Sequence, residues 1–310
     1  MVGLGALGTV AATQLVRAGV GYMRLIDRDI VEASNLQRQV LFDESDAALH
    51  LPKALAAAEK LRAASSGVAV EERIADLTPR NAEALLGDVD LIVDGTDNFQ
   101  TRHLVNDVAV KHRIPWVYGG AVSSYGTTAL LRPGKTPCLV CLFGALTPAA
   151  PETCDTVGVI APVVGVIASL QVAEALKYLA GREDALRDGI TYVDVWANQW
   201  RTVRFPPRSA QCPCCGLGRF DALAARSDAL TISFCGRNTV QVRPDGEREV
   251  SFADLASRLA RVGSVRLGRE TLRIEVDKAQ ITLFRDGRAL VHGVDDPAAA
   301  RSLYARYIGM

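Results

Sequence analysis

The sequence is poor in aromatic residues and carries no excess of charge of either sign. Aromatic side chains make up 6% of the 310 residues, and 35 basic residues balance 35 acidic ones. A protein that binds nucleic acid normally shows a basic excess, so the zero net charge argues against a nucleic-acid partner. Hydrophobic residues make up 49% of the chain, with Ala, Val, Leu and Gly abundant. This composition is typical of an α/β enzyme with buried parallel strands.

Long hydrophobic runs are also missing. The longest apolar stretch, Val157–Leu170, contains Pro162 and two glycines and is shorter than the roughly 20 residues that cross a membrane. We therefore expect a buried helix there and no membrane partner. A glycine motif begins at Gly3 with no secretory signal before it, so we expect a cytoplasmic protein. The seven cysteines then favour metal binding or thiol chemistry over a disulfide framework.

The pattern of apolar residues divides the chain into two predicted domains, 1–222 and 223–310. In the first domain, predicted strands lie at 22–26, 68–74, 91–93 and 116–118, and predicted helices at 6–18, 52–64, 79–86 and 99–112. This alternation predicts βαβ units and a doubly wound, mostly parallel sheet. A further strand at 123–131 follows a turn without an intervening helix, which predicts a mixed sheet. The second domain is predicted as a small α+β unit with a last helix at 297–307, and nothing in it indicates chemistry.

The sequence GLGALG at residues 3–8 opens the first predicted helix. Glycines at this spacing let the backbone turn tightly and approach phosphate, while the helix N-terminus offers N–H groups to anionic oxygens. Asp27 ends the next strand about 20 residues later, where an acid accepts hydrogen bonds from ribose hydroxyls. By itself the motif fits NAD as well as ATP, and a strand–helix turn without a ligand is a third interpretation.

Cationic side chains follow the ribose acid. The segment from Asp27 to Gln39 ends in SNLQRQ, which includes Arg38, and Lys53 stands at the start of the next helix. An NAD enzyme has little need of fixed cations here, whereas the charge of a triphosphate must be neutralised before phosphorus is attacked. Each cation alone would be interpreted as a solvated surface charge. Together with the glycine motif they favour ATP.

The sequence DGTDN at residues 94–98 directly follows the apolar strand at 91–93. Ligands bind at the carboxyl ends of parallel strands, and a carboxylate is the hard oxygen ligand that Mg²⁺ prefers. Asp97 is therefore a candidate Mg²⁺ ligand. The alternative is that Asp97 caps the predicted helix at 99–112.

Two CxxC pairs, Cys138 with Cys141 and Cys212 with Cys215, match the spacing of a closed tetrahedral Zn²⁺ site. Cys214 lies inside the second pair and could compete as a ligand, but the two-residue spacing favours Cys212 with Cys215.

Cys154 stands apart from these pairs, on a predicted loop at 133–156. As a lone cysteine it is ordinarily a small inert side chain. A place beside a helix N-terminus could lower its pKa and make it nucleophilic.

As a set, these residues resemble the ThiF/MoeB/HesA family, prokaryotic relatives of the ubiquitin-activating enzymes. The matching segments, in order through about residue 220, are GLGALG at 3–8, residues 27–39, Pro52-Lys53, DGTDN at 94–98, both CxxC pairs, and TCDTVGVIAPVVGVIASLQVAEALK at 153–177. The last domain looks like the extension of certain bacterial ThiF-type proteins. The resemblance implies a Rossmann-like adenylation domain, normally a homodimer. The usual substrate of the family is a ubiquitin-like sulfur-carrier protein ending in Gly-Gly, of the ThiS or MoaD type, in thiamine or molybdopterin biosynthesis.

The resemblance also implies roles for individual residues. The terminal carboxylate of the carrier would attack the α-phosphorus of ATP, with Asp27 on the ribose and Asp97 on Mg²⁺. Cys154 matches the position where some ThiF proteins form a covalent adduct with the carrier, whereas other members need only adenylation. The predicted catalytic residues are Arg38, Lys53, Asp97 and Cys154. The predicted ATP-binding residues are Gly3, Gly5, Ala6, Gly8, Asp27, Ser34, Asn35, Leu36, Gln37, Arg38, Lys53, Asp97 and Asn98.

The chain departs from the family pattern in two places. The second of two adjacent glycines in the motif is Ala6 here, which the start of a helix accommodates. The family also has a longer segment before the motif, which includes an arginine that reaches the partner subunit's ATP, where this sequence has Met1 and Val2. A zinc-stabilised carrier-binding module with impaired catalysis is therefore the alternative function, and an NAD-linked oxidoreductase is the third.

Overall fold

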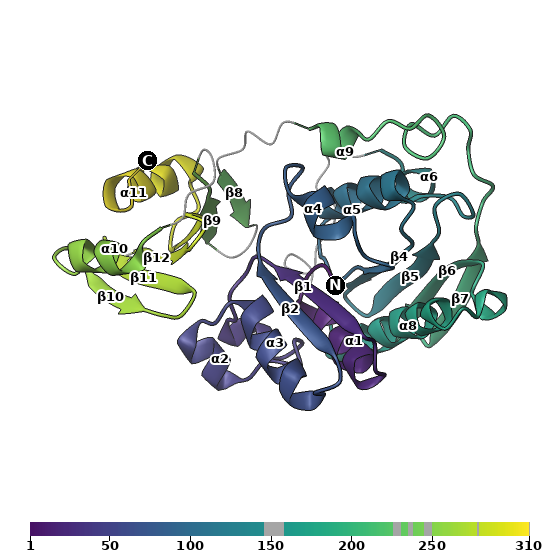
Figure 1. The fold of residues 1–310 in the computed structure, drawn as a ribbon, viewed down its shortest axis with the longest axis horizontal. Coiled ribbons are helices and arrows are strands. Elements are labelled where there is room, and N and C mark those ends of the chain that lie inside the picture. Colours follow the sequence, from purple (N-terminus) through teal and green to yellow (C-terminus); the bar gives the residue numbers. More distant parts are fainter. Residues whose placement is uncertain (146–157, 226–230, 235–237, 245–249, 278, 310) are drawn as a thin grey trace. The chain divides into compact units, whose positions relative to one another are not determined.

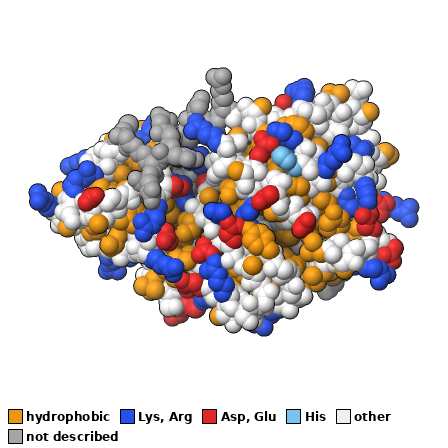
Figure 2. Space-filling view, viewed as in Figure 1, with side chains coloured by type: hydrophobic (Ala, Val, Ile, Leu, Met, Phe, Trp, Pro, Cys, Tyr) orange, Lys and Arg blue, Asp and Glu red, His pale blue; other side chains and the backbone are white. Residues whose placement is uncertain are grey.

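The computed structural model describes residues 1–145, 158–225, 231–234, 238–244, 250–277 and 279–309. The chain divides into two compact units, Met1–Ser227 and Asp228–Met310. On the face drawn in space-filling form, basic and acidic side chains are interspersed, in keeping with the balanced charge of the sequence (Figure 2).

The first unit alternates strands and helices (Figure 1). Its strands are β1 (Tyr22–Asp27), β2 (Ala69–Ile74), β3 (Ile92–Val93), β4 (Trp116–Val122), β5 (Tyr125–Leu131), β6 (Gly189–Asp194) and β7 (Gln199–Arg204). Its helices are α1 (Ala6–Arg17), α2 (Glu44–Leu49), α3 (Lys53–Ala64), α4 (Ala82–Leu86), α5 (Phe99–His112), α6 (Leu139–Phe143), α8 (Ala161–Leu179) and α9 (Asp221–Ala224), with the short 3-10 turns η1 (Ala33–Asn35) and η2 (Glu183–Ala185).

The pairing of the strands brings the carboxyl ends of β1 and β3 to the same edge. β1 pairs in parallel with β2, and β3 pairs in parallel with β4. Val2 forms parallel bridges to Ile26 and to Asp94, so the first residues lie between β1 and β3. Strands β5, β6 and β7 continue the sheet beyond β4 in antiparallel order. The mixed α/β architecture predicted from the sequence is therefore confirmed.

Helix α8 is long and apolar enough to cross a membrane by length and composition, but 44% of its apolar window is buried in the protein. Its inner face packs on α1, β4 and β5, which confirms the buried helix expected there. A Cβ on Gly119 of β4 would lie 2.4 Å from the amide of Gln171 on this helix. This close approach explains why a glycine stands at residue 119 of β4, a strand that continues to Val122, beyond the predicted end at residue 118.

One predicted helix boundary differs from the structure, and one helix was not predicted, each for a local reason. The helix predicted at 79–86 begins only at Ala82, because the side chain of Asn81 accepts a hydrogen bond from the backbone of Thr78 at 2.8 Å and closes a turn first. Helix α2 was not predicted because it is short, and it begins with a capping box between Asp43 and Asp46.

The second unit is a six-stranded antiparallel sheet covered on one face by two helices. Its elements are β8 (Thr231–Phe234), β9 (Thr239–Val242), α10 (Phe252–Leu259), β10 (Ser264–Leu267), β11 (Thr271–Val276), β12 (Ala279–Phe284), β13 (Ala289–His292) and α11 (Pro297–Tyr307). Leu272 and Ile281 alternate with polar residues on their strands, and together with Val291 they are completely buried against the helices. A turn at Asp286-Gly287 joins β12 to β13.

Candidate functional site

The glycine motif packs backbone against backbone on the loop that follows β3. Gly3 has a φ of +83°, a conformation that residues with a side chain rarely adopt. A Cβ on Gly8 would lie 2.0 Å from the carbonyl oxygen of Gly3, and one on Gly95 would lie 2.5 Å from the same oxygen. Gly5 differs, because the nearest atom to its Cβ would be the carbonyl oxygen of Gly95 at 3.8 Å. Gly3 and Gly8 therefore leave no room for a side chain. Gly5, directly before α1 begins at Ala6, has room for one and leaves this side of the motif accessible to a ligand.

This difference predicts opposite effects for two similar substitutions. Gly8→Ala is expected to lower the free energy of unfolding by about 3 kcal/mol, because the methyl group collides with backbone that cannot move aside. Gly5→Ala is expected to leave stability within about 0.5 kcal/mol of the parent while weakening ATP binding, because its methyl group occupies the open side of the motif. Urea unfolding and calorimetric titration with ATP measure the two effects. Equal stability of the two variants would contradict the packing described here.

Asp27 is fixed against the glycine motif at the end of β1. One carboxylate oxygen accepts a hydrogen bond from the backbone N–H of Leu4 at 2.6 Å, and the other accepts one from Asp29 at 2.7 Å. Burial raises the pKa of Asp27, and the charge of Lys53 and these two backbone donors oppose the shift. The acid predicted to bind ribose is thus held where the glycine motif and β1 meet.

Lys53 is a buried cation beside this acid. Its side chain is 3% exposed, at the first residue of α3, and its ammonium nitrogen lies 3.4 Å from a carboxylate oxygen of Asp29. The alternative interpretation of Lys53 as a solvated surface charge is therefore wrong. Arg38 is half-buried, and its guanidinium donates to the carbonyl oxygen of Ser34 at 3.1 Å.

Two amide side chains in the segment SNLQRQ are buried one helical turn apart. Asn35 is 1% exposed and Gln39 is 3% exposed, and the backbone N–H of Gln39 donates to the carbonyl of Asn35 at 3.0 Å. Within the described residues, the side-chain oxygens of both amides have no hydrogen-bond donor. Buried acceptors of this kind are uncommon and are expected next to binding sites. Gln39 was not among the predicted site residues, although its place one turn after Asn35 was a visible signal.

The other predicted residues of this segment are more accessible. Ser34 and Gln37 are exposed, and Leu36 is half-buried.

Asp97 is exposed at the carboxyl end of β3, and the side-chain amide of Asn98 donates to it at 3.3 Å. Asn98, rather than Asp97, caps α5, because its side-chain oxygen accepts a hydrogen bond from the backbone of Thr101 at 2.8 Å. The interpretation of Asp97 as the helix cap is therefore wrong. The carboxylate of Asp97 stands at the same edge of the sheet as Asp27.

Arg102 holds the loop that carries Asp97, and the sequence did not single it out. Its guanidinium is buried and lies 3.1 Å from a carboxylate oxygen of Asp94. The same guanidinium donates to the carbonyl oxygens of Thr96 at 2.6 Å and Gly119 at 2.8 Å. The sequence does not indicate whether an arginine near the start of a helix is exposed or buried, so the burial of Arg102 could not be predicted.

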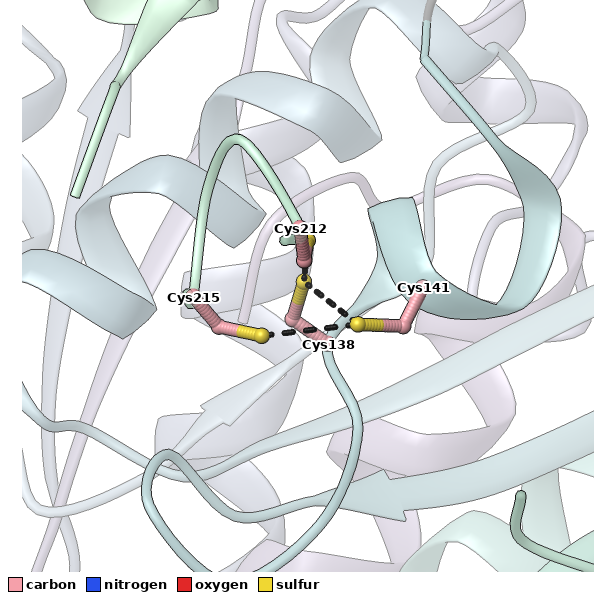
Figure 3. A group of neighbouring side chains, drawn as sticks. All are labelled: Cys138, Cys141, Cys212 and Cys215. Carbon is pink, nitrogen blue, oxygen red and sulfur yellow. Dashed lines mark hydrogen bonds between the residues drawn. The ribbon is translucent and has the colours of Figure 1, made fainter. Parts of the chain in front are cut away.

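Four cysteines from distant segments form one cluster, as Figure 3 shows. Their sulfur atoms all lie within 4.8 Å of one another, with separations of 3.9 Å for Cys138 and Cys141, 3.7 Å for Cys138 and Cys212, and 3.4 Å for Cys141 and Cys215. A tetrahedral zinc ion with Zn–S bonds of about 2.3 Å would separate its sulfur ligands by about 3.8 Å. The cluster therefore fits the predicted four-thiolate metal site.

The thiols of this cluster cannot all ionise without a cation. Hydrogen bonds, first from Cys214 and then from other cysteines, lower the pKa of Cys138 to about 4. Burial raises the pKa of Cys215, and the charge on Cys138 raises it further. A divalent metal ion would remove this conflict because it favours the thiolate form of every ligand.

Helix α5 fixes both halves of the cluster from the side. The side chain of Asn106 accepts a hydrogen bond from the backbone of Leu139 at 2.8 Å and donates to the sulfur of Cys214 at 3.2 Å. The Cys214 thiol in turn lies 3.5 Å from a carboxylate oxygen of Asp107. These contacts leave Cys212 to join Cys215 in the group of four, as predicted. Cys154 and Cys235 lie outside the described residues.

Comparison with known proteins gives matches over most of the chain. The model of the ThiF family matches residues 1–214. The sulfur carrier protein ThiS adenylyltransferase of Bacillus subtilis is 44% identical over 311 residues, which cover 100% of this chain and 92% of that protein. The sulfur carrier protein adenylyltransferase of Thermus thermophilus is 40% identical over 244 residues, which cover 76% of this chain and 87% of that protein.

Solved structures also resemble the chain. The crystal structure of E. coli MccB with MccA-N7isoASN superimposes with a TM-score of 0.61 at 26% identity and covers 69% of this chain and 65% of that one. A structure of E. coli MccB with ATP gives a TM-score of 0.61 at 25% identity over the same share of this chain. The match thus spans about two thirds of the MccB chain.

Proposed function

The chain belongs to the ThiF family, and on that premise we propose that it is an ATP-dependent adenylyltransferase acting on a sulfur-carrier protein. The observation that carries the proposal is the buried ammonium of Lys53, beside Asp27 and the open face of the glycine motif. A buried cation in this position suits the dense charge of a triphosphate better than it suits a dinucleotide. The oxidoreductase alternative has no such need of it.

In the proposed reaction, an oxygen of the terminal carboxylate of the carrier attacks the α-phosphorus of ATP. The bond between this phosphorus and the bridging oxygen breaks, and pyrophosphate leaves with the electron pair, so that an acyl-adenylate forms. Asp27 binds the ribose, while Asn35, Arg38 and Lys53 bind the phosphates and offset the charge that builds up on the leaving group. Asp97 provides an oxygen ligand to the Mg²⁺ ion that accompanies ATP.

The nucleotide site belongs to a proposed Rossmann-like domain at 1–222, and the parallel strands β1, β2, β3 and β4 support this assignment. Zinc in the four-cysteine cluster would act as a structural cross-link, since all four positions around the ion are filled by protein thiolates. Residues 223–310 form the proposed small α+β domain. The covalent role of Cys154 stays a prediction.

We propose a carrier of the ThiS type that ends in Gly-Gly. The B. subtilis relative, whose name includes ThiS, matches along the whole chain and so includes the second unit. The T. thermophilus relative, named only for a sulfur carrier, matches a smaller share. A cytoplasmic homodimer is the assembly proposed from the family resemblance.

Exchange of labelled pyrophosphate into ATP tests the proposal directly. We expect exchange with a ThiS-type carrier that ends in Gly-Gly, weaker exchange with a MoaD-type carrier, and none with either carrier shortened by its last glycine. The shortened carriers are matched controls, because they keep the folded body and lack only the reacting end. Binding of carriers without exchange would instead favour the non-catalytic carrier-binding module.

Asp97→Asn is expected to raise the Mg²⁺ concentration for half-maximal exchange by about 10-fold to 100-fold, because an amide oxygen is a neutral and weaker ligand than a carboxylate. A Mg²⁺ titration at saturating ATP measures the effect. Asp184→Asn is the control, since Asp184 is exposed and pairs with Arg182 outside the site. An unchanged Mg²⁺ requirement in Asp97→Asn would rule out the ligand role.

A further inference from the structure

The position of Lys53 depends on Asp29 twice, once through the backbone and once through the side chain. The backbone N–H of Lys53 donates to the carbonyl oxygen of Asp29 at 2.9 Å. The N–H of Val31 donates to the carbonyl oxygen of Leu51 at 2.8 Å, and Ile30 forms an antiparallel bridge with Pro52. Residues 29–31 and 51–53 therefore lie side by side, which places the Asp29 carboxylate next to the first residue of α3.

The side-chain contact explains how a cation is kept in a buried place. Among the described residues, the Lys53 ammonium has one hydrogen-bond partner, the Asp29 carboxylate at 3.4 Å. An ammonium has three donors, so two stay available for another acceptor. Lys53 is 3% exposed, and an anion close to a buried cation offsets part of the cost of removing its charge from water.

The charged groups around this pair come from the ends of β1 and β2. Asp27 and Asp29 face Lys53 from the end of β1. Arg28 lies 4.0 Å from Asp29 and 3.2 Å from Asp76, which follows β2. Arg28 therefore has a closer carboxylate partner in Asp76 than in Asp29, and a different oxygen of Asp29 lies next to Lys53.

We propose that Asp29 is a positioning residue for the nucleotide: its carboxylate orients the buried Lys53 ammonium, so that two N–H donors meet the phosphate oxygens of ATP. Asp29 itself touches no reacting atom in this scheme. The inference rests on the proposed function for the identity of the phosphate ligand. It adds a residue that neither the glycine motif nor the cation positions indicated.

The test compares Asp29→Asn with the parent by calorimetric titration with Mg-ATP at pH 7 and pH 9.5, without carrier. Free lysine has a pKa near 10.4, and burial without an anion lowers the pKa of a lysine. In the parent, the ATP affinity is expected to change less than about threefold between the two pH values. In Asp29→Asn, the buried ammonium has lost its carboxylate partner, so the affinity is expected to fall about 10-fold at pH 7 and by a further 10-fold or so at pH 9.5.

Three further variants make the outcome specific. Asp29→Glu keeps the anion and is expected to keep the parent's flat pH profile with an affinity loss of a few-fold. Asp29→Asn combined with Lys53→Arg restores a cation that stays charged at pH 9.5, so its ATP affinity is expected to be independent of pH. Asp88→Asn removes an exposed carboxylate paired with Arg24 and serves as the matched control.

A flat pH profile for Asp29→Asn, with or without weaker binding, would overturn the positioning role and leave Asp29 a purely structural residue. A parent protein that binds ATP in the expected manner but shows no carrier-dependent exchange would overturn the proposed function alone. A parent that binds no ATP would overturn both.

Discussion

Replacing Lys53 with alanine is expected to lower carrier-dependent exchange of pyrophosphate into ATP by about 10³-fold, or about 4 kcal/mol of transition-state stabilisation. The expectation follows from burial. The Lys53 side chain is 3% exposed, so water or ions from solution cannot easily take over the role of its charge after the substitution. The four carboxylates at this edge of the sheet, Asp27, Asp29, Asp76 and Asp97, would then repel the triphosphate with one cation fewer to offset them.

The measurement is the exchange rate at saturating ATP and carrier, together with circular dichroism to show that α3 is intact. Lys111→Ala is the matched control, because Lys111 is exposed at the end of α5 and pairs with Glu83. Lys53→Arg is expected to recover part of the activity, since it keeps the charge but changes the geometry of the donors. Exchange within tenfold of the parent in a folded Lys53→Ala protein would show that the buried cation does not act on phosphate.

Removing one cysteine of the four-thiolate cluster is expected to have the largest effect on stability. Cys212→Ala should lose the metal and about 4 kcal/mol of unfolding free energy, a fraction of the roughly 10 to 16 kcal/mol with which structural zinc binds zinc-finger peptides. For a unit of this size, that loss lowers the Tm by about 10 °C. The physical reason is that Cys138 and Cys212 join segments 74 residues apart, and a metal ion bound by the cluster would hold both against α5.

Cys214→Ser supplies a matched control from the same turn of chain. Cys214 is buried like Cys212, but its sulfur bonds to Asn106 and Asp107 instead of completing the group of four. Metal content by mass spectrometry is expected to stay near one zinc per chain in Cys214→Ser and to fall to almost none in Cys212→Ala. Loss of zinc from Cys214→Ser alone would exchange the roles of the two cysteines.

The structure also connects the metal cluster to the nucleotide edge through one helix. Asn98, Arg102 and Asn106 follow one another at four-residue intervals along α5. They cap the helix, hold the loop that carries Asp97, and brace the cysteine cluster, in that order. Residues four apart lie on the same face of a helix. The position of Asp97 therefore depends on the same helix face that supports the cysteine cluster.

Much of the fold and of the site could be read from the sequence because it depends on neighbours along the chain. Three features of the site are local patterns: the glycine spacing at 3–8, the acid at the end of β1 and the CxxC pairs. In each of them, the residue types and their spacing along the chain indicate the ligand. The strong periodicity of α1 and α5 likewise predicted those helices to within a few residues. Short elements such as α2 and β10 were missed, since four to six residues leave too little pattern to recognise.

What only the tertiary structure decided is which charged groups are buried and what they touch. Lys53 and Arg38 looked alike in the sequence, yet only Lys53 is deeply buried. The sequence offered Asp97 as a cap for α5, and only the hydrogen bond from Thr101 shows that Asn98 is the cap. Contacts such as Asn106 with Cys214, 108 residues apart, arise when distant segments pack together, and no interval along the chain encodes them. The sequence therefore determined the kind of chemistry, and packing determined which side chains are placed to carry it out.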